Sequence, residues 1–256
     1  MLELPTNQPQ PVAKILDDGI KLFFYSFPKV LPLVLADVLL SVMLHLIVPE
    51  LNSPDPAVVI EALTNSVVYL FFYAVAMLIL QAAIFYRIGM IFTQSDSGNI
   101  PALLQGVKKL LPIVLATWLY TFLFAAGLLI LVPGILFAVS LRFFTPLILF
   151  DNATVLESLQ HSHKLVWGNW WHTAMVLLIP LTMIFSVALL SSMIVETILN
   201  SSTTLAAEQV NLVIQITYKI VDKLLNPLFY ALIVVQFYEL KRLNQSHRQV
   251  ENQLIA

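Results

Sequence analysis

The chain has 256 residues, of which 59% are hydrophobic and only 11% are charged, and its formal net charge is −2. Its mean hydropathy is +0.87. Soluble domains usually carry about 25% charged residues, so this composition excludes a soluble enzyme, a nucleic-acid-binding protein and a disordered protein. The chain has no cysteine, which excludes disulfides and thiolate metal sites. The sequence therefore predicts an all-α integral membrane protein.

The N-terminal region begins with a polar, proline-rich stretch and continues as an amphipathic segment. Residues 1–11 have no cationic start and no cleavage site, which predicts a short disordered cytoplasmic tail rather than a signal peptide. Residues 12–27 place apolar side chains at helical spacing. Residues 100–111, with Asn99 as the expected N-cap, and residues 152–167 repeat this pattern. We expect all three segments to be interfacial helices at the membrane surface.

Six segments are apolar for about the 20 residues that a helix needs to cross a bilayer. Pro133 and Gly134 predict a tight turn between the third and fourth of them, and Pro146 predicts a bend in the fourth. The last segment follows a polar-interrupted helix at residues 205–225. The predicted spans are residues 30–48, 66–86, 110–132, 134–150, 173–199 and about 221–240.

The positive charges predict the orientation of these spans. Ten lysines and arginines fall on one side of the six-span topology, whereas the opposite loops, residues 49–65 and 200–206, hold none. The positive-inside rule therefore places both termini in the cytoplasm. The ten residues are Lys14, Lys21, Lys29, Arg87, Lys108, Lys109, Lys164, Lys241, Arg242 and Arg248.

The three amphipathic segments align with one another. Each has an apolar residue, a small residue three positions later, a lysine two further on, and a second apolar residue. Each also precedes a pair of spans, which predicts three parallel repeats of an interfacial helix and a hairpin, at residues 12–92, 99–150 and 152–243. Residues 12–243 then form one membrane domain, followed by a cytoplasmic tail at 244–256. The aligned residues are Leu16, Gly19, Lys21 and Phe23; Leu103, Gly106, Lys108 and Leu110; and Leu159, Ser162, Lys164 and Val166.

The charged residues inside the predicted spans include Asp37, Arg142, Asp222 and Lys223. Intramembrane charges are costly and are usually either paired or functional. One interpretation is a buried ion pair between Arg142 and Asp37 or Asp222 that holds helices together. The other is a path for a ligand or an ion that these side chains line.

Histidine residues give no metal site in this sequence. His45 lies in the first span and is interpreted as a packing residue, with a proton relay as the alternative. Glu157 and His161 are helical neighbours in the third amphipathic segment, but a second pair of ligands is missing. No metal and no cofactor is therefore expected.

Aromatic and basic residues gather at the predicted cytoplasmic surface. Trp167, Trp170 and Trp171 are typical of the aromatic belt of a membrane protein. The alternative is a groove for lipid acyl chains beside cationic side chains that bind anionic headgroups. The candidates for headgroup binding are Lys21, Lys108 and Lys164.

A stretch of about 40 residues resembles a known family. Residues 131–135 read Leu-Val-Pro-Gly-Ile, and Pro146, Asp151, Glu157-Ser158, Ser162 and Gly168-Asn169-Trp170 follow. This stretch resembles the YciC-type family of bacterial inner-membrane proteins and the membrane domain of glycerophosphodiester phosphodiesterases. The resemblance implies a bacterial inner membrane and a lipid-related role in the cell envelope. It implies no catalytic residues, because the phosphodiesterase catalytic domain has no counterpart in this sequence.

The sequence favours a non-enzymatic membrane protein. It has no His-Glu-x-x-His, no glycine-rich phosphate loop and no Gly-x-Ser-x-Gly. We therefore predict that the protein binds or organises lipids, or that it is a scaffold for an envelope partner or for a second copy of itself. The alternative is a transporter or channel for a small solute or an ion.

Overall fold

The computed structural model describes residues 9–48, 55–95, 98–130, 132–202 and 207–255, and within these residues the regular secondary structure is entirely helical. Six helical stretches there are long and apolar enough to cross a membrane. The helices are α1 (Val12–Ile47), α2 (Pro56–Asn65), α3 (Val67–Phe92), α4 (Asn99–Lys108), α5 (Leu110–Leu128), α6 (Val132–Ser140), α7 (Phe144–Phe150), α8 (Val155–Val166), α9 (Trp170–Ser202) and α10 (Ala207–Ile255).

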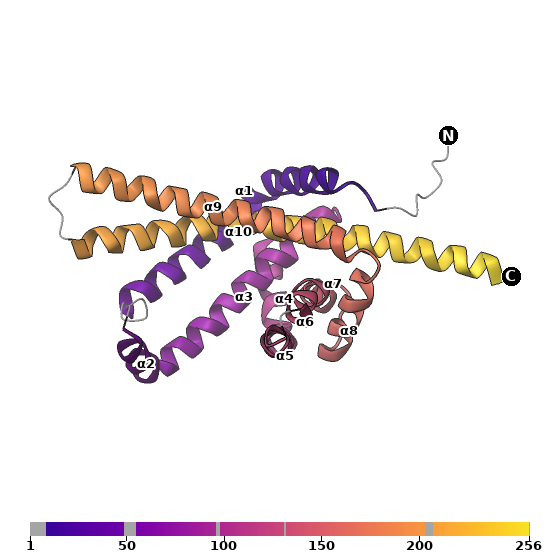
Figure 1. The fold of residues 1–256 in the computed structure, drawn as a ribbon, viewed down its shortest axis with the longest axis horizontal. Helices are drawn as coiled ribbons and strands as arrows, with labels where there is room; N and C mark the ends of the chain where they lie inside the picture. Colours follow the sequence, from indigo (N-terminus) through magenta and orange to yellow (C-terminus); the bar gives the residue numbers. More distant parts are fainter. Residues whose placement is uncertain (1–8, 49–54, 96–97, 131, 203–206, 256) are drawn as a thin grey trace.

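Helix α1 joins two elements that the sequence predicts separately. It runs without interruption through Pro28 and Pro32, and Figure 1 shows it bending between its N-terminal part and the remainder. Proline removes one backbone hydrogen bond and displaces the preceding turn, which bends a helix without necessarily ending it. The amphipathic segment and the first span are therefore two arms of one bent helix.

The fourth predicted span is broken rather than bent. Helix α6 ends at Ser140 and α7 begins at Phe144, so the change of direction lies before Pro146. Pro146 is in the first turn of α7, where a missing N–H leaves no bond unmade. The bend predicted at Pro146 is thus corrected to a break at residues 141–143.

The hairpin between α5 and α6 also differs from the prediction. Pro133 and Gly134 lie in the first turn of α6, so the turn precedes them. Gly134 instead allows the two helices to meet closely, because a Cβ atom on it would lie 2.7 Å from the backbone nitrogen of Leu128. Gly127 has the same close approach, 2.7 Å from the nitrogen of Gly134.

Three further boundaries differ from the sequence-based expectation. The polar segment before the sixth span and that span form one helix, α10, which passes through Pro227 and continues into the C-terminal tail. Helix α2 lies in a stretch that was expected to be a loop, and the Asp55 carboxylate accepts a hydrogen bond from the Ala57 N–H at its start. Gly98, not Asn99, is the N-cap of α4.

The apolar helices do not form a parallel bundle. Helices α9 and α10 run side by side along the long axis of the molecule, whereas α5 and α6 are seen nearly end-on (Figure 1). Helix α10 packs against α1, α3 and α9, and its segment from Leu228 to Leu243 contributes many of the buried core residues, including the fully buried Phe237. The divergence of the helices places a cavity between α3, α5, α7 and α10.

The small residues at the aligned position of the three amphipathic segments share one structural role. A Cβ atom on Gly19 would lie 2.3 Å from the Leu232 side chain of α10, and one on Gly106 would lie 2.7 Å from the Ile79 carbonyl oxygen of α3. Ser162 is fully buried against the α6–α7 break. The aligned lysines are exposed. The small side chain therefore marks the side on which each helix packs onto the protein.

We expect Gly106→Ala to destabilise the protein. Alanine favours a helix over glycine by up to about 1 kcal/mol, but the added methyl group would collide with a backbone carbonyl that cannot move independently, and such overpacking costs roughly 1–3 kcal/mol. Thermal unfolding in detergent should show a lower midpoint for Gly106→Ala. Leu104→Ala, at an exposed position of the same helix, is the control, and an equal loss in both variants would contradict the prediction.

Candidate functional site

The buried charges do not pair as the sequence suggests. Asp37 of α1 forms an ion pair with Lys223 of α10, with 3.3 Å between Oδ2 and Nζ, and both side chains are buried. Arg142 forms neither of the two ion pairs predicted for it. Its side chain makes no hydrogen bond and no ion pair with the residues that the structure describes. Its guanidinium lies over the ring of Phe229, 5.3 Å from the centroid.

The position of Arg142 is fixed by the break between α6 and α7. Ser162 of α8 completes the hydrogen bonds that the break leaves open: its hydroxyl accepts from the Phe143 N–H at 3.0 Å and donates to the Ser140 carbonyl at 2.7 Å. Backbone groups at helix ends need such partners when they are buried. One buried serine thereby holds the backbone on both sides of Arg142.

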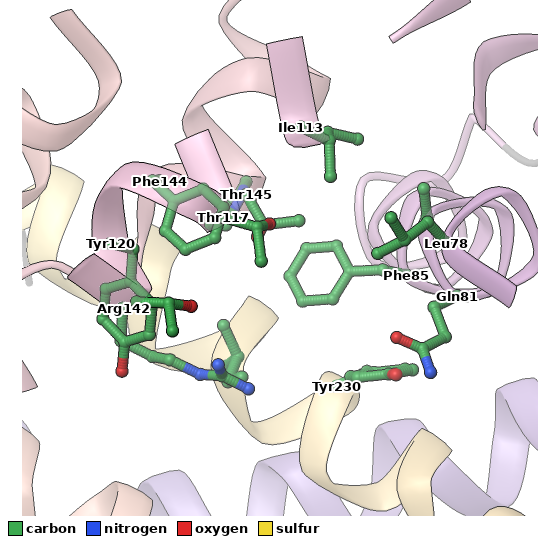
Figure 2. Close-up of a pocket in the computed structure, with 14 residues that line it drawn as sticks. Leu78, Gln81, Phe85, Ile113, Thr117, Tyr120, Arg142, Phe144, Thr145 and Tyr230 are labelled. Atoms are coloured by element: carbon green, nitrogen blue, oxygen red, sulfur yellow. The ribbon is translucent and has the colours of Figure 1, made fainter. Parts of the chain in front are cut away.

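Arg142 borders a cavity of about 200 Å³ between four helices. Figure 2 shows its side chain reaching into the space between Tyr120 and Tyr230, with Gln81 on the far side. Hydroxyl and amide groups make much of this wall polar, although every helix that supplies them is mostly apolar. The polar residues that line the cavity are Gln81 of α3, Thr117, Tyr120 and Thr121 of α5, Arg142, Thr145 of α7 and Tyr230 of α10.

A second, apolar groove of about 600 Å³ lies on another side of the same arginine. Arg142 and Tyr120 line both spaces. The groove is walled by residues such as Phe124, Leu128 and Leu181. It shares Ile135, Trp170 and Trp171 with a further apolar hollow of about 760 Å³. The Arg142 side chain therefore lies between a polar cavity and an apolar groove.

The predicted tryptophan cluster contributes to this groove. The Trp170 Nε1–H donates to the Leu136 carbonyl at 3.4 Å, which ties α9 to α6. Trp171 and Trp167 are 78% and 64% exposed. Trp170 and Trp171 thus line an apolar groove that extends to Arg142.

The three predicted headgroup lysines do not form one site. Lys21, Lys108 and Lys164 are exposed on α1, α4 and α8, and none of them lines the Arg142 cavity. Lys21 forms an ion pair with Asp17 at 2.6 Å. They remain three separate positive positions on the protein surface.

The carboxylate of Glu157 caps its own helix. It accepts hydrogen bonds from the Thr154 N–H at 3.1 Å and the Thr154 hydroxyl at 2.8 Å. These bonds, the backbone one first, lower the pKa of Glu157 below its ordinary value. Within the described part of the chain, no group of three or more histidine, aspartate or glutamate side chains is placed to hold a metal ion.

Sequence reasoning identified Arg142 but missed the polar residues around it. Gln81, Thr117 and Tyr230 lie on helices whose dominant sequence signal is their hydrophobicity. Their signal is a polar side chain on one face of an otherwise apolar helix, as with Thr117 and Thr121, which are one turn apart on α5.

Residues 56–240 match the model of the family described as Domain of unknown function (DUF7847). This range runs from α2 into α10 and contains every residue that lines the Arg142 cavity. No curated protein and no solved structure matches the chain.

Proposed function

We propose that the chain, which belongs to the DUF7847 family, is a multi-pass membrane protein that binds an anionic lipid. The observation that carries this proposal is the position of the Arg142 guanidinium. Its guanidinium has no acidic partner among the described residues and stands between a polar cavity and an apolar groove. An amphiphile with a negatively charged head and a long apolar tail complements both surfaces.

Insertion into a membrane is supported by the outward faces of the helices. Trp118, Phe122 and Phe72 are 76%, 68% and 66% exposed, and many other large apolar side chains are exposed as well. So many exposed apolar side chains are a liability in water and are expected in a bilayer. The distribution of lysine and arginine supports cytoplasmic termini, and the resemblance to YciC-type proteins supports a bacterial inner membrane.

The three parallel repeats are part of the same proposal. The buried small residues Gly19, Gly106 and Ser162 give the aligned segments a common packing face. The exposed lysines then face the cytoplasmic leaflet, where each basic residue near the surface attracts anionic lipids with roughly 1 kcal/mol. These lysines raise the local concentration of anionic lipid, and Arg142 retains one molecule of it.

The chemistry of the cavity favours binding over catalysis. A guanidinium binds a phosphate or carboxylate through two parallel N–H donors, and the threonine and tyrosine hydroxyls can donate further bonds. The described residues that line the cavity include no carboxylate or imidazole that could act as a general base. A bound anion would also compensate the cost of placing an arginine inside a membrane.

Native mass spectrometry of the protein released from mild detergent tests the proposal. We expect a stoichiometric lipid of one anionic headgroup class on the wild type. Because charge-assisted hydrogen bonds contribute about 1.5–3 kcal/mol, Arg142→Gln should weaken retention on the order of tenfold to a hundredfold. Lys14→Gln, which makes the same charge change at an exposed position outside the three aligned lysines, should retain the lipid. A lipid-free wild type, or full retention by Arg142→Gln, would refute the proposal.

The buried Asp37–Lys223 pair favours a second candidate, transport of a small solute or an ion. These charges lie at the contact of α1 and α10 and do not line the Arg142 cavity. Flux assays in liposomes distinguish the two functions. Transport would require solute movement that Lys223→Gln reduces, whereas lipid binding at Arg142 requires none.

A further inference from the structure

A polar seam runs along the contact between α1 and α10. Asp37, Ser41 and His45 follow one another at one-turn intervals on a single face of α1, and each is at most 4% exposed. Helix α10 presents Lys223 opposite Asp37, and its Lys219 lies within electrostatic reach of His45. Such a row of polar side chains is unexpected between two apolar helices.

The charges around Asp37, at one end of this seam, do not balance. Asp222 lies within electrostatic reach of both Asp37 and Lys223, and the Asn226 amide donates to its Oδ2 atom at 3.4 Å. Two carboxylates thus share one ammonium group. Lys219 is one turn away, beside Lys223 rather than beside the carboxylates. With both carboxylates ionised, the cluster of Asp37, Asp222 and Lys223 carries one excess negative charge.

One buried carboxylate oxygen in the seam lacks a hydrogen-bond partner. The Asp37 Oδ2 atom contacts Lys223, but its Oδ1 atom has no partner among the described residues. An unsatisfied polar atom that is buried costs roughly 1–3 kcal/mol, and more if it is charged. The Oδ1 atom of Asp37 is therefore available to bind a proton.

We propose that the Asp37–Asp222–Lys223 cluster is a proton-binding site inside the membrane. One proton adds to a carboxylate oxygen of the pair of aspartates and leaves one carboxylic acid, one carboxylate and one ammonium group, with no net charge. Neutralisation is the usual response of a buried group whose charge is not compensated. The titratable groups within electrostatic reach of Asp37 are Asp222, Lys223 and Tyr230 of α10 and Tyr73 of α3. Lys219 of α10 and His45 of α1 lie near each other farther along the seam.

Infrared difference spectroscopy of the full chain in liposomes tests this site, because protonated carboxyl groups have their own C=O stretching band. Near neutral pH the exposed aspartates and glutamates are ionised, so we expect one carboxylic acid per wild-type molecule. Asp37→Asn and Asp222→Asn should each abolish the band, since the remaining carboxylate then pairs with Lys223. Lys223→Gln should double it. Glu61→Gln, at an exposed position of α2 outside the predicted spans, should leave it unchanged.

Three results would overturn the proposal. The first is a wild type without a carboxylic acid band at any pH above the range in which exposed carboxylates titrate. This measurement requires no variant, so it stands even if a substitution prevents folding. The second is a band that persists in both aspartate variants. The third is a band removed by sodium at constant pH, because a metal cation would then be the ligand. None of these results depends on lipid binding at Arg142.

Discussion

Replacing Lys223 with methionine should strongly destabilise the protein, by roughly 3–5 kcal/mol, the usual cost of removing one partner of a buried ion pair. Lys223 is the partner of Asp37 at 3.3 Å, and the Asp37 side chain is only 4% exposed. Methionine keeps most of the apolar stem of lysine but lacks the ammonium group, so the loss of stability reports the loss of the charge. Denaturant or thermal unfolding in detergent measures the difference in the free energy of unfolding.

Lys219→Met is the matched control for this prediction. Lys219 is a half-buried lysine one turn away on the same helix and has no acidic partner among the described residues, so its removal should cost little. The double variant Asp37→Asn with Lys223→Met should recover much of the loss, because it leaves fewer uncompensated charges. The cost of Lys223→Met should also fall as the pH is lowered, since protons then neutralise the carboxylates. Equal losses in the two lysine variants would contradict the prediction.

The positions of apolar helices could be predicted because a run of about 20 apolar residues is a strong signal in a sequence. The predicted spans at residues 66–86 and from residue 110 agree with α3 and α5 at their starts. The break at residues 141–143 could not be predicted, because Leu141, Arg142 and Phe143 include neither glycine nor proline. The backbone at the break is hydrogen-bonded by Ser162, which is distant in the sequence. The two prolines that predicted a turn and a bend, Pro133 and Pro146, instead lie in the first turns of α6 and α7.

The charged residues of the site could be recognised individually, but their partners could not. A charge inside a span stands out in any hydropathy pattern. Which charges meet depends on the rotation of each helix about its axis, and this is decided by close contacts such as those of Gly19 with Leu232 and of Gly106 with Ile79. The alignment of the three amphipathic segments with one another identified these small residues, but it could not identify the surfaces that they face.

Ser162→Ala is the second substitution for which we expect a large effect. Ser162 is fully buried and is the hydrogen-bond partner of both the Phe143 N–H and the Ser140 carbonyl. Alanine has nearly the same volume, so packing should be preserved while two buried backbone groups lose their partner. Each such group costs about 1–3 kcal/mol, so the two together give a loss on the order of 2–6 kcal/mol. Unfolding in detergent measures it, and retention of lipid should fall because the break positions Arg142.

Ser158→Ala provides the control, because Ser158 is also fully buried on α8 but bonds only to the Val155 carbonyl of its own helix. If both variants unfold equally easily, hydrogen bonding at the break is not what Ser162 contributes. The comparison also explains why the aligned small residue is glycine in two segments and serine in the third. Gly19 and Gly106 face helices that are continuous at the contact, where a small volume suffices. Ser162 faces a helix that is interrupted, where a small side chain must also donate and accept.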